Sequence, residues 1–264
     1  MPIVNANGVD LFHKFDGPEN GTRLVFSNSL CSRLEMWEPQ ITALVGEGYR
    51  ILRYDSRGHG RSDAPEGHYS MEMLSDDLAA LMDAVGWENA HFCGLSKGGM
   101  VGQLMGTRHP ERLLSLTLCD TSAYMGGPDD VWEPRVRTVL ASGTEGVVES
   151  SVDRWFTSQS KLRIPEEVEK VREMIRTTPQ AGFVGCVRAV QSLDRRIANG
   201  CITAPTLVIV GEFDPGTPPS HAQMIHETIK GSELVIIKSA AHLTNIENPE
   251  AFNTALLDFL KRVG

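Results

Sequence analysis

The residues of this chain best suited to chemistry surround Ser96, in the stretch Gly-Leu-Ser-Lys-Gly at residues 94–98. Gly-x-Ser-x-Gly is the pattern of a nucleophile elbow, a sharp turn from strand to helix that leaves no room for side chains beside the serine. An apolar run precedes the motif at residues 89–93, and a helical pattern follows it at residues 99–107. This setting predicts a serine nucleophile at a helix N-terminus, where free N–H groups favour a negatively charged oxyanion.

A serine hydroxyl needs a base within hydrogen-bond reach and a third group that orients the base. We predict that His242 is the base and Asp214 the orienting acid, because both follow predicted strands on the same side of the sheet as Ser96. Glu212 and Asp120 are alternatives for the acid, since either could also lie at the carboxyl end of a strand. Asp214 is favoured because Asp-Pro in a turn fixes the direction of the carboxylate.

Two other loops bear on this chemistry. Residues 27–32 follow a short apolar strand, in the place where the second N–H group of an oxyanion hole is normally found. His59 is a further candidate base, but it lies between two glycines in a polar loop. For His59 we favour the role of a structural turn residue.

The elements that must position these residues alternate between strand and helix. Apolar runs predict strands at residues 9–15, 23–26, 49–54, 89–93, 113–119, 206–210 and 234–237. Helical spacing predicts helices at residues 37–44, 70–85, 99–107 and 249–261. The alternation predicts an α/β fold, a mostly parallel sheet flanked by helices, with ligands bound at the carboxyl ends of the strands.

A purely helical block interrupts this alternation. Between residues 122 and 199 the strand signals stop, and helices are predicted at residues 132–140, 146–156, 165–176 and 179–192. We therefore predict a core made of residues 1–121 and 200–264, with residues 122–199 inserted as a helical cap over the strand ends.

Composition limits the partners and the location of the protein. A net charge of −9 and a pI near 5.4 argue against nucleic acid and against an anionic membrane as partners. No apolar run approaches the roughly 18 residues of a membrane span, and the first residues lack the pattern of a signal peptide. The five cysteines are widely spaced, so neither a disulfide framework nor a zinc site is predicted. We expect a cytoplasmic protein, with a homo-oligomer possible.

Four motifs together resemble the α/β-hydrolase superfamily over essentially the whole chain; they lie at residues 53–62, 92–100, 211–219 and 240–243. The order Ser, Asp, His along the chain is also that of the superfamily. Within it, the chain is most similar to the 3-oxoadipate enol-lactonases of aromatic catabolism, on residues 27–30, 36–40, 115–121 and 241–250.

The resemblance implies hydrolysis of an enol-lactone to 3-oxoadipate. Ser96 would attack the ring carbonyl while His242 takes its proton, and the N–H groups of Leu30 and Lys97 would hold the oxyanion. No metal or organic cofactor is implied. Most relatives have His-Gly-x at the oxyanion loop, where this chain has Asn28-Ser29-Leu30, a departure that the lactonases share. Lys97 is a second departure, because an apolar residue usually follows the nucleophile.

The substrate that the resemblance implies is a small lactone with a free carboxylate, and a buried pocket must pair that charge. Trp132 and Arg135 lie one helical turn apart in the first cap helix, and arginine suits a carboxylate through its fork of donors. Lys97 and Arg154 are rival cations, and Arg135 on a solvated helix face is an open alternative. Other functions also stay open: a different ester or lactone hydrolase, a cofactor-free perhydrolase, or a ligand receptor without catalysis.

Overall fold

A computed structural model describes residues 2–126 and 132–264 of the chain. In the described part, a sheet of eight strands has the order β1-β2-β4-β3-β5-β6-β7-β8. Its strands are β1 (Ile3–Ala6), β2 (Val9–Asp16), β3 (Thr22–Ser27), β4 (Tyr49–Tyr54), β5 (Ala90–Leu95), β6 (Leu113–Cys119), β7 (Thr206–Gly211) and β8 (Glu233–Ile237). β1 and β2 run antiparallel to their neighbours, and the six other strands pair in parallel.

Helices cover the sheet. α2 packs against α3, and α1 packs against α11. Every residue of β5 and β7 is buried, which a parallel strand achieves only when both faces of its sheet are covered. The helices of this part of the chain are α1 (Glu38–Gly46), α2 (Met71–Ala84), α3 (Lys97–Arg108), α9 (Pro219–Thr228), α10 (Thr244–Glu247) and α11 (Pro249–Val263).

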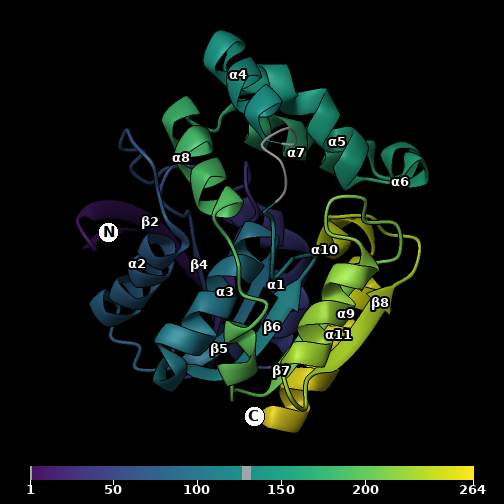
Figure 1. Cartoon of the computed structure of the whole chain (residues 1–264). Helices are drawn as coiled ribbons and strands as arrows, with labels where there is room; N and C mark the ends of the chain where they lie inside the picture. Colours follow the sequence, from purple (N-terminus) through teal and green to yellow (C-terminus); the bar gives the residue numbers. More distant parts are fainter. Residues whose placement is uncertain (1, 127–131) are drawn as a thin grey trace.

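The helices between β6 and β7 gather beyond one end of the sheet, where Figure 1 shows α4, α5, α7 and α8 above the strands. They are α4 (Glu133–Ser142), α5 (Val148–Trp155), α6 (Ser158–Arg163), α7 (Pro165–Arg176) and α8 (Gln180–Gln191). α8 lies close to the loop after β4, because a Cβ atom at Gly182 would be only 1.8 Å from the carbonyl oxygen of Gly58. The backbone of Gly58 therefore requires glycine at position 182.

The mostly parallel sheet expected from the sequence is confirmed, and each predicted strand is found within two residues of its expected bounds. The prediction was incomplete, since β1, α6, α9 and α10 were not expected. β1 pairs with β2 through a tight turn in which Asn7 and Gly8 have φ angles of 51° and 79°. In the described residues, no helix is long and apolar enough to cross a membrane.

Candidate active site

Ser96 occupies the sharp turn between β5 and α3, with φ 56° and ψ −113°. This left-handed conformation is strained for a residue with a side chain, and it turns the serine out of the line of the strand. The flanking glycines are required by close packing: a Cβ atom at Gly94 would lie 2.3 Å from the Gly98 carbonyl oxygen, and one at Gly98 would lie 2.0 Å from that of Ser27. The local geometry of a nucleophile elbow is thus present.

His242 follows β8 and Asp214 follows β7, and the two side chains form a buried pair. The Nδ1 atom of His242 lies 2.7 Å from Oδ2 of Asp214. Oδ1 of Asp214 accepts hydrogen bonds from the N–H groups of Gly216 at 2.8 Å and Thr217 at 3.0 Å, and the Thr217 hydroxyl donates to Oδ2 at 2.7 Å. This network holds the carboxylate in one orientation toward the imidazole.

The same network sets the pKa of Asp214. Burial alone would raise this pKa, but the charge of His242 and the hydrogen bonds from His242 and Thr217 outweigh burial and lower it. Asp214 is therefore a carboxylate at neutral pH, in the ionisation state needed to stabilise a positively charged imidazole.

The two alternative acids point elsewhere. Asp120 is buried and accepts hydrogen bonds from the Gly211 N–H at 2.9 Å and from the hydroxyl of Thr244. Burial, followed by the nearby charge of Asp214, raises the pKa of Asp120 well above its ordinary value. Glu212 instead pairs with Lys238 at 2.9 Å, at the surface. Of the three candidate acids, it is Asp214 whose hydrogen bond to His242 the structure records.

The loop that contains Leu30 is held by buried hydrogen bonds. Asn28 donates to the carbonyl oxygen of Tyr54 at 2.7 Å and accepts from Nε1 of Trp37 at 2.9 Å. The N–H of Cys31, which has a φ of 57°, donates to Nε2 of His59 at 3.0 Å. Asn28 and Cys31 thus fix the backbone on both sides of the proposed oxyanion donor.

His59 is therefore part of the scaffold beneath this loop, as the sequence suggested for a turn residue. Its Nδ1 lies 3.2 Å from the carbonyl oxygen of Arg57, so Nδ1 carries the proton when Nε2 accepts from Cys31. Burial, and then the charge of Lys97, lower the pKa of His59 well below its ordinary value. The imidazole is neutral and serves as a hydrogen-bond acceptor for the loop.

The side chain of Lys97 also lies in this buried region. Its Nζ donates a hydrogen bond to Oγ of Ser56 and lies 3.5 Å from Nδ1 of His59. Burial lowers the pKa of Lys97. Because this amino group already donates to Ser56 inside the protein, we no longer expect it to bind a substrate carboxylate.

Ser96 and His242 line one cavity of about 570 Å³, a size suited to a small organic molecule. Leu30, Lys97, Trp132, Arg135 and Arg154 line the same cavity. Much of the remaining wall is apolar or aromatic and comes from Met100, Tyr124, Met125, Trp155 and Val190. The structure thus brings the predicted nucleophile, base, oxyanion donors and substrate-binding residues to one pocket.

Three residues that the sequence analysis did not identify complete the surroundings of His242. Trp155 stacks on the imidazole, with ring centroids 6.2 Å apart at 28°. Thr217 contacts Asp214 and lies 3.4 Å from Nδ1 of His242. The buried carboxylate of Glu247 accepts from the N–H groups of Ala241 and Thr157, so it joins the histidine loop to the start of α6. The turn Asp-Pro-Gly-Thr was a usable signal for Thr217 alone.

Known proteins are similar to this chain in both sequence and structure. The family model described as "alpha/beta hydrolase fold" matches residues 22–249. 3-oxoadipate enol-lactonase 1 of Acinetobacter baylyi is 34% identical over 261 residues, which cover 99% of this chain and 97% of the relative. A putative carbamate hydrolase, RutD, of Variovorax paradoxus is 28% identical over 259 residues, covering 96% and 97%.

A solved structure of an enol-lactonase is also similar to this chain. The crystal structure of the enol-lactonase from Burkholderia xenovorans LB400 superposes with a TM-score of 0.95 and 36% sequence identity. The match covers 98% of this chain and all of the other. Both the strand topology and the inserted helical segment therefore lie within a match of nearly full length.

Proposed function

The chain belongs to the alpha/beta hydrolase family, and from that premise we propose that it hydrolyses 3-oxoadipate enol-lactone to 3-oxoadipate with a triad of Ser96, His242 and Asp214. Family and relatives support a lactone hydrolase as the broader activity. The observation that supports the triad most directly is the 2.7 Å hydrogen bond between His242 and Asp214 beside the cavity that Ser96 lines.

In the proposed mechanism, the tautomer of His242 decides which nitrogen takes the proton. Because Nδ1 faces Asp214, Nδ1 carries the hydrogen and Nε2 is left as the base for the Ser96 hydroxyl. Proton transfer to Nε2 makes an imidazolium, which the ionised Asp214 stabilises across the hydrogen bond. The hydroxyl oxygen then forms a bond to the lactone carbonyl carbon.

The resulting oxyanion would be held by the N–H groups of Leu30 and Lys97. Lys97 is the first residue of α3, so its N–H has no partner within the helix and the helix dipole favours negative charge there. Two such donors are together worth several kcal/mol of transition-state stabilisation, since removal of one donor from a related site costs about 2.7–4 kcal/mol.

Collapse of this intermediate breaks the ring C–O bond and leaves an acyl group on Ser96. The leaving group is a stable enolate that needs little assistance; it takes the proton held by the His242 imidazolium, which returns His242 to its neutral form, and tautomerises to the ketone. Water, activated by His242, then hydrolyses the acyl-enzyme and releases the new carboxylate. Every bond change in this scheme is supplied by the triad and water, so we expect no metal or cofactor.

We further propose that helices α4 to α8 act as a cap over the pocket, with Trp132 and Arg135 as its substrate-binding residues. The guanidinium of Arg135 lies 5.3 Å from the ring of Trp132. An apolar ring beside a fork of donors suits a flat lactone that carries one carboxylate. Arg135 would pair this carboxylate, because a carboxylate buried without a partner is costly.

The test is to follow the ultraviolet absorbance of the conjugated enol-lactone with purified protein. Rapid loss of absorbance that depends on Ser96 is the expected result. A parallel panel of simple esters, carbamates and other lactones, with an assay for peracid formation, distinguishes the proposed activity from those suggested by other relatives. Faster turnover of a carbamate than of the enol-lactone would refute the proposed substrate, and binding without turnover would indicate a receptor.

A further inference from the structure

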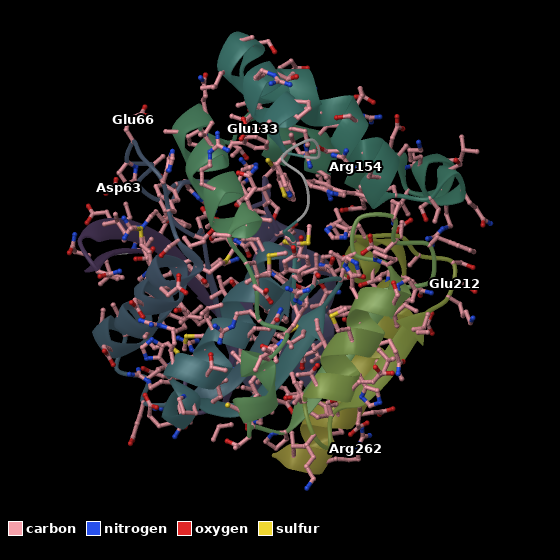
Figure 2. The ribbon with its side chains drawn as sticks, in the orientation of Figure 1. Asp63, Glu66, Glu133, Arg154, Glu212 and Arg262 are labelled. Atoms are coloured by element: carbon pink, nitrogen blue, oxygen red, sulfur yellow. The ribbon has the colours of Figure 1, made fainter. Side chains whose placement is uncertain are left out.

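Two arginines share the pocket with Ser96 and His242. Arg135 is in the first turn of α4 and Arg154 is in the last turn of α5, and Figure 2 labels Arg154 in the helical segment above the strands. Among the described residues that line this cavity none is acidic, although the chain as a whole has a net charge of −9. The cavity thus concentrates positive charge in an acidic protein.

Neither guanidinium has a carboxylate partner in the described residues. Arg135 donates to the hydroxyl of Ser151 at 3.1 Å, while its Nε is buried without a hydrogen-bond partner. Nη2 of Arg154 is likewise buried and unpartnered. The buried arginines Arg53 and Arg57, by contrast, are paired, Arg53 with Asp16 at 2.7 Å and Arg57 with Asp77 at 2.6 Å.

The two charges also act on each other. Burial, followed by the charge of Arg154, lowers the pKa of Arg135 to about 10, and burial lowers the pKa of Arg154. Both groups stay charged at neutral pH, so the pocket holds two half-buried cations that repel each other. An anionic ligand would supply the partner that the two guanidinium groups lack, and it would offset the repulsion between them.

The contacts of α5 show how the two arginines are arranged. Ser151, which Arg135 contacts, is one helical turn before Arg154, so the guanidinium of Arg135 reaches the face of α5 that carries Arg154. The next residue, Trp155, accepts hydrogen bonds from the N–H of His242 and of Leu243, each at 3.2 Å. Arg154 is therefore the arginine whose backbone adjoins the loop of the proposed base.

We infer that Arg154 is a second carboxylate-binding residue, and that it and Arg135 together select ligands with two carboxylates. Two guanidinium groups are balanced by two negative charges, whereas a single carboxylate would leave one half-buried cation without a counter-charge. The identity of the carboxylates rests on the proposed function. The lactone has one carboxylate for Arg135; hydrolysis adds water across the ester bond and creates a second at Ser96, on the side of His242 and Arg154. The ring-opened dicarboxylate should accordingly bind more tightly than the lactone.

The test measures binding without turnover, by calorimetry on the Ser96→Ala protein. Adipate is the six-carbon dicarboxylate probe, and hexanoate and dimethyl adipate are probes of similar length with one carboxylate and none. Adipate should bind at least about tenfold more tightly than hexanoate, the scale of a hydrogen bond to a charged group. When Arg154→Gln is added to the Ser96→Ala protein, the affinity for adipate should fall to that for hexanoate. Arg154→Lys in its place should keep part of the preference for adipate.

Arg172→Gln provides the matched control, because Arg172 lies in the same helical segment but pairs with Glu149 at 2.8 Å outside the pocket. This variant should bind adipate as the parent does, and circular dichroism checks that each variant is folded. Equal affinity of the parent for adipate and hexanoate would overturn the inference, as would equal effects of Arg154→Gln and Arg172→Gln. Adipate selectivity without lactone turnover by the wild type would instead refute the proposed function alone.

Discussion

The backbone carbonyl of Trp155 accepts a hydrogen bond of 3.2 Å from the N–H of His242, and the Trp155 ring stacks on the imidazole. The two residues come from different parts of the fold, since Trp155 ends α5 in the helical segment and His242 follows the last strand of the sheet. The position of the proposed base therefore depends on the inserted helices as well as on the sheet. A change in the packing of α5 would reach His242 through this contact.

Replacing the nucleophile should abolish turnover without unfolding the protein. Ser96 lines the cavity and is not part of the apolar core, so we expect Ser96→Ala to lower kcat by at least ~10³-fold and to leave the melting temperature close to that of the wild type. The ultraviolet assay and a thermal melt measure the two effects. Substantial activity of Ser96→Ala would mean that water attacks the lactone directly, with His242 as a general base.

Removing the charge of the orienting acid should be nearly as severe. Asp214→Asn allows the wrong tautomer of His242 and should reduce kcat by roughly 10⁴-fold, the scale of the same change in other triads. Glu212→Gln is the matched control, because Glu212 pairs with Lys238 at the surface, and it should keep wild-type activity. Asp120→Asn should also stay active. Loss of activity in Glu212→Gln or Asp120→Asn, but not in Asp214→Asn, would show that Asp214 is the wrong choice for the acid of the triad.

Local sequence signals were sufficient to predict most strands of the sheet and the turn at Ser96. Buried strands have short apolar runs, and the glycines around Ser96 are needed for reasons within a few residues of the motif. The fold class and the resemblance to enol-lactonases are confirmed by the family match and by the relatives. β1 was missed because it is short and contains a polar residue, although Asn7-Gly8 is the strongest short-range signal for a hairpin.

The contacts around His242 could not be predicted in the same way. Trp155 and Glu247 act on the histidine loop through pairings between segments far apart in the chain, and no spacing in the sequence determines which segments meet. The direction of the Lys97 side chain could not be predicted for the same reason, because it depends on a contact between distant segments. Its acceptor, Ser56, lies in the loop after β4, and only the parallel order of β4, β3 and β5 brings that loop to the elbow.

The buried neutral state of His59 should make the stability of the protein sensitive to acid. Its pKa in the folded state lies below the ordinary 6.5, so below that pH the unfolded chain binds a proton that the folded chain does not. The free energy of unfolding should therefore fall as the pH drops, by up to about 1.4 kcal/mol per pH unit from this group.

Urea unfolding at about pH 7.5 and 5.5, on either side of the ordinary histidine pKa, measures this effect. His59→Gln retains an acceptor for the Cys31 N–H but cannot take up a proton, so its stability should fall less over the same interval. His68→Gln changes an exposed histidine and should follow the wild type. Identical slopes for His59→Gln and the wild type would show that His59 does not contribute to the acid sensitivity.

The last prediction separates substrate recognition by Arg135 from structural support. Arg135 contacts Ser151 and lies 5.9 Å from the ring of Phe183, so its removal could also loosen the helical segment. If Arg135 pairs the substrate carboxylate, Arg135→Ala should weaken kcat/KM for the carboxylated lactone by roughly 1.5–3 kcal/mol, the scale of a hydrogen bond to a charged group. A neutral lactone of similar size should be spared, and Arg137→Ala, an exposed change on the same helix, should affect neither. Equal losses of Arg135→Ala on both lactones would show that Arg135 supports the helices and does not bind the carboxylate.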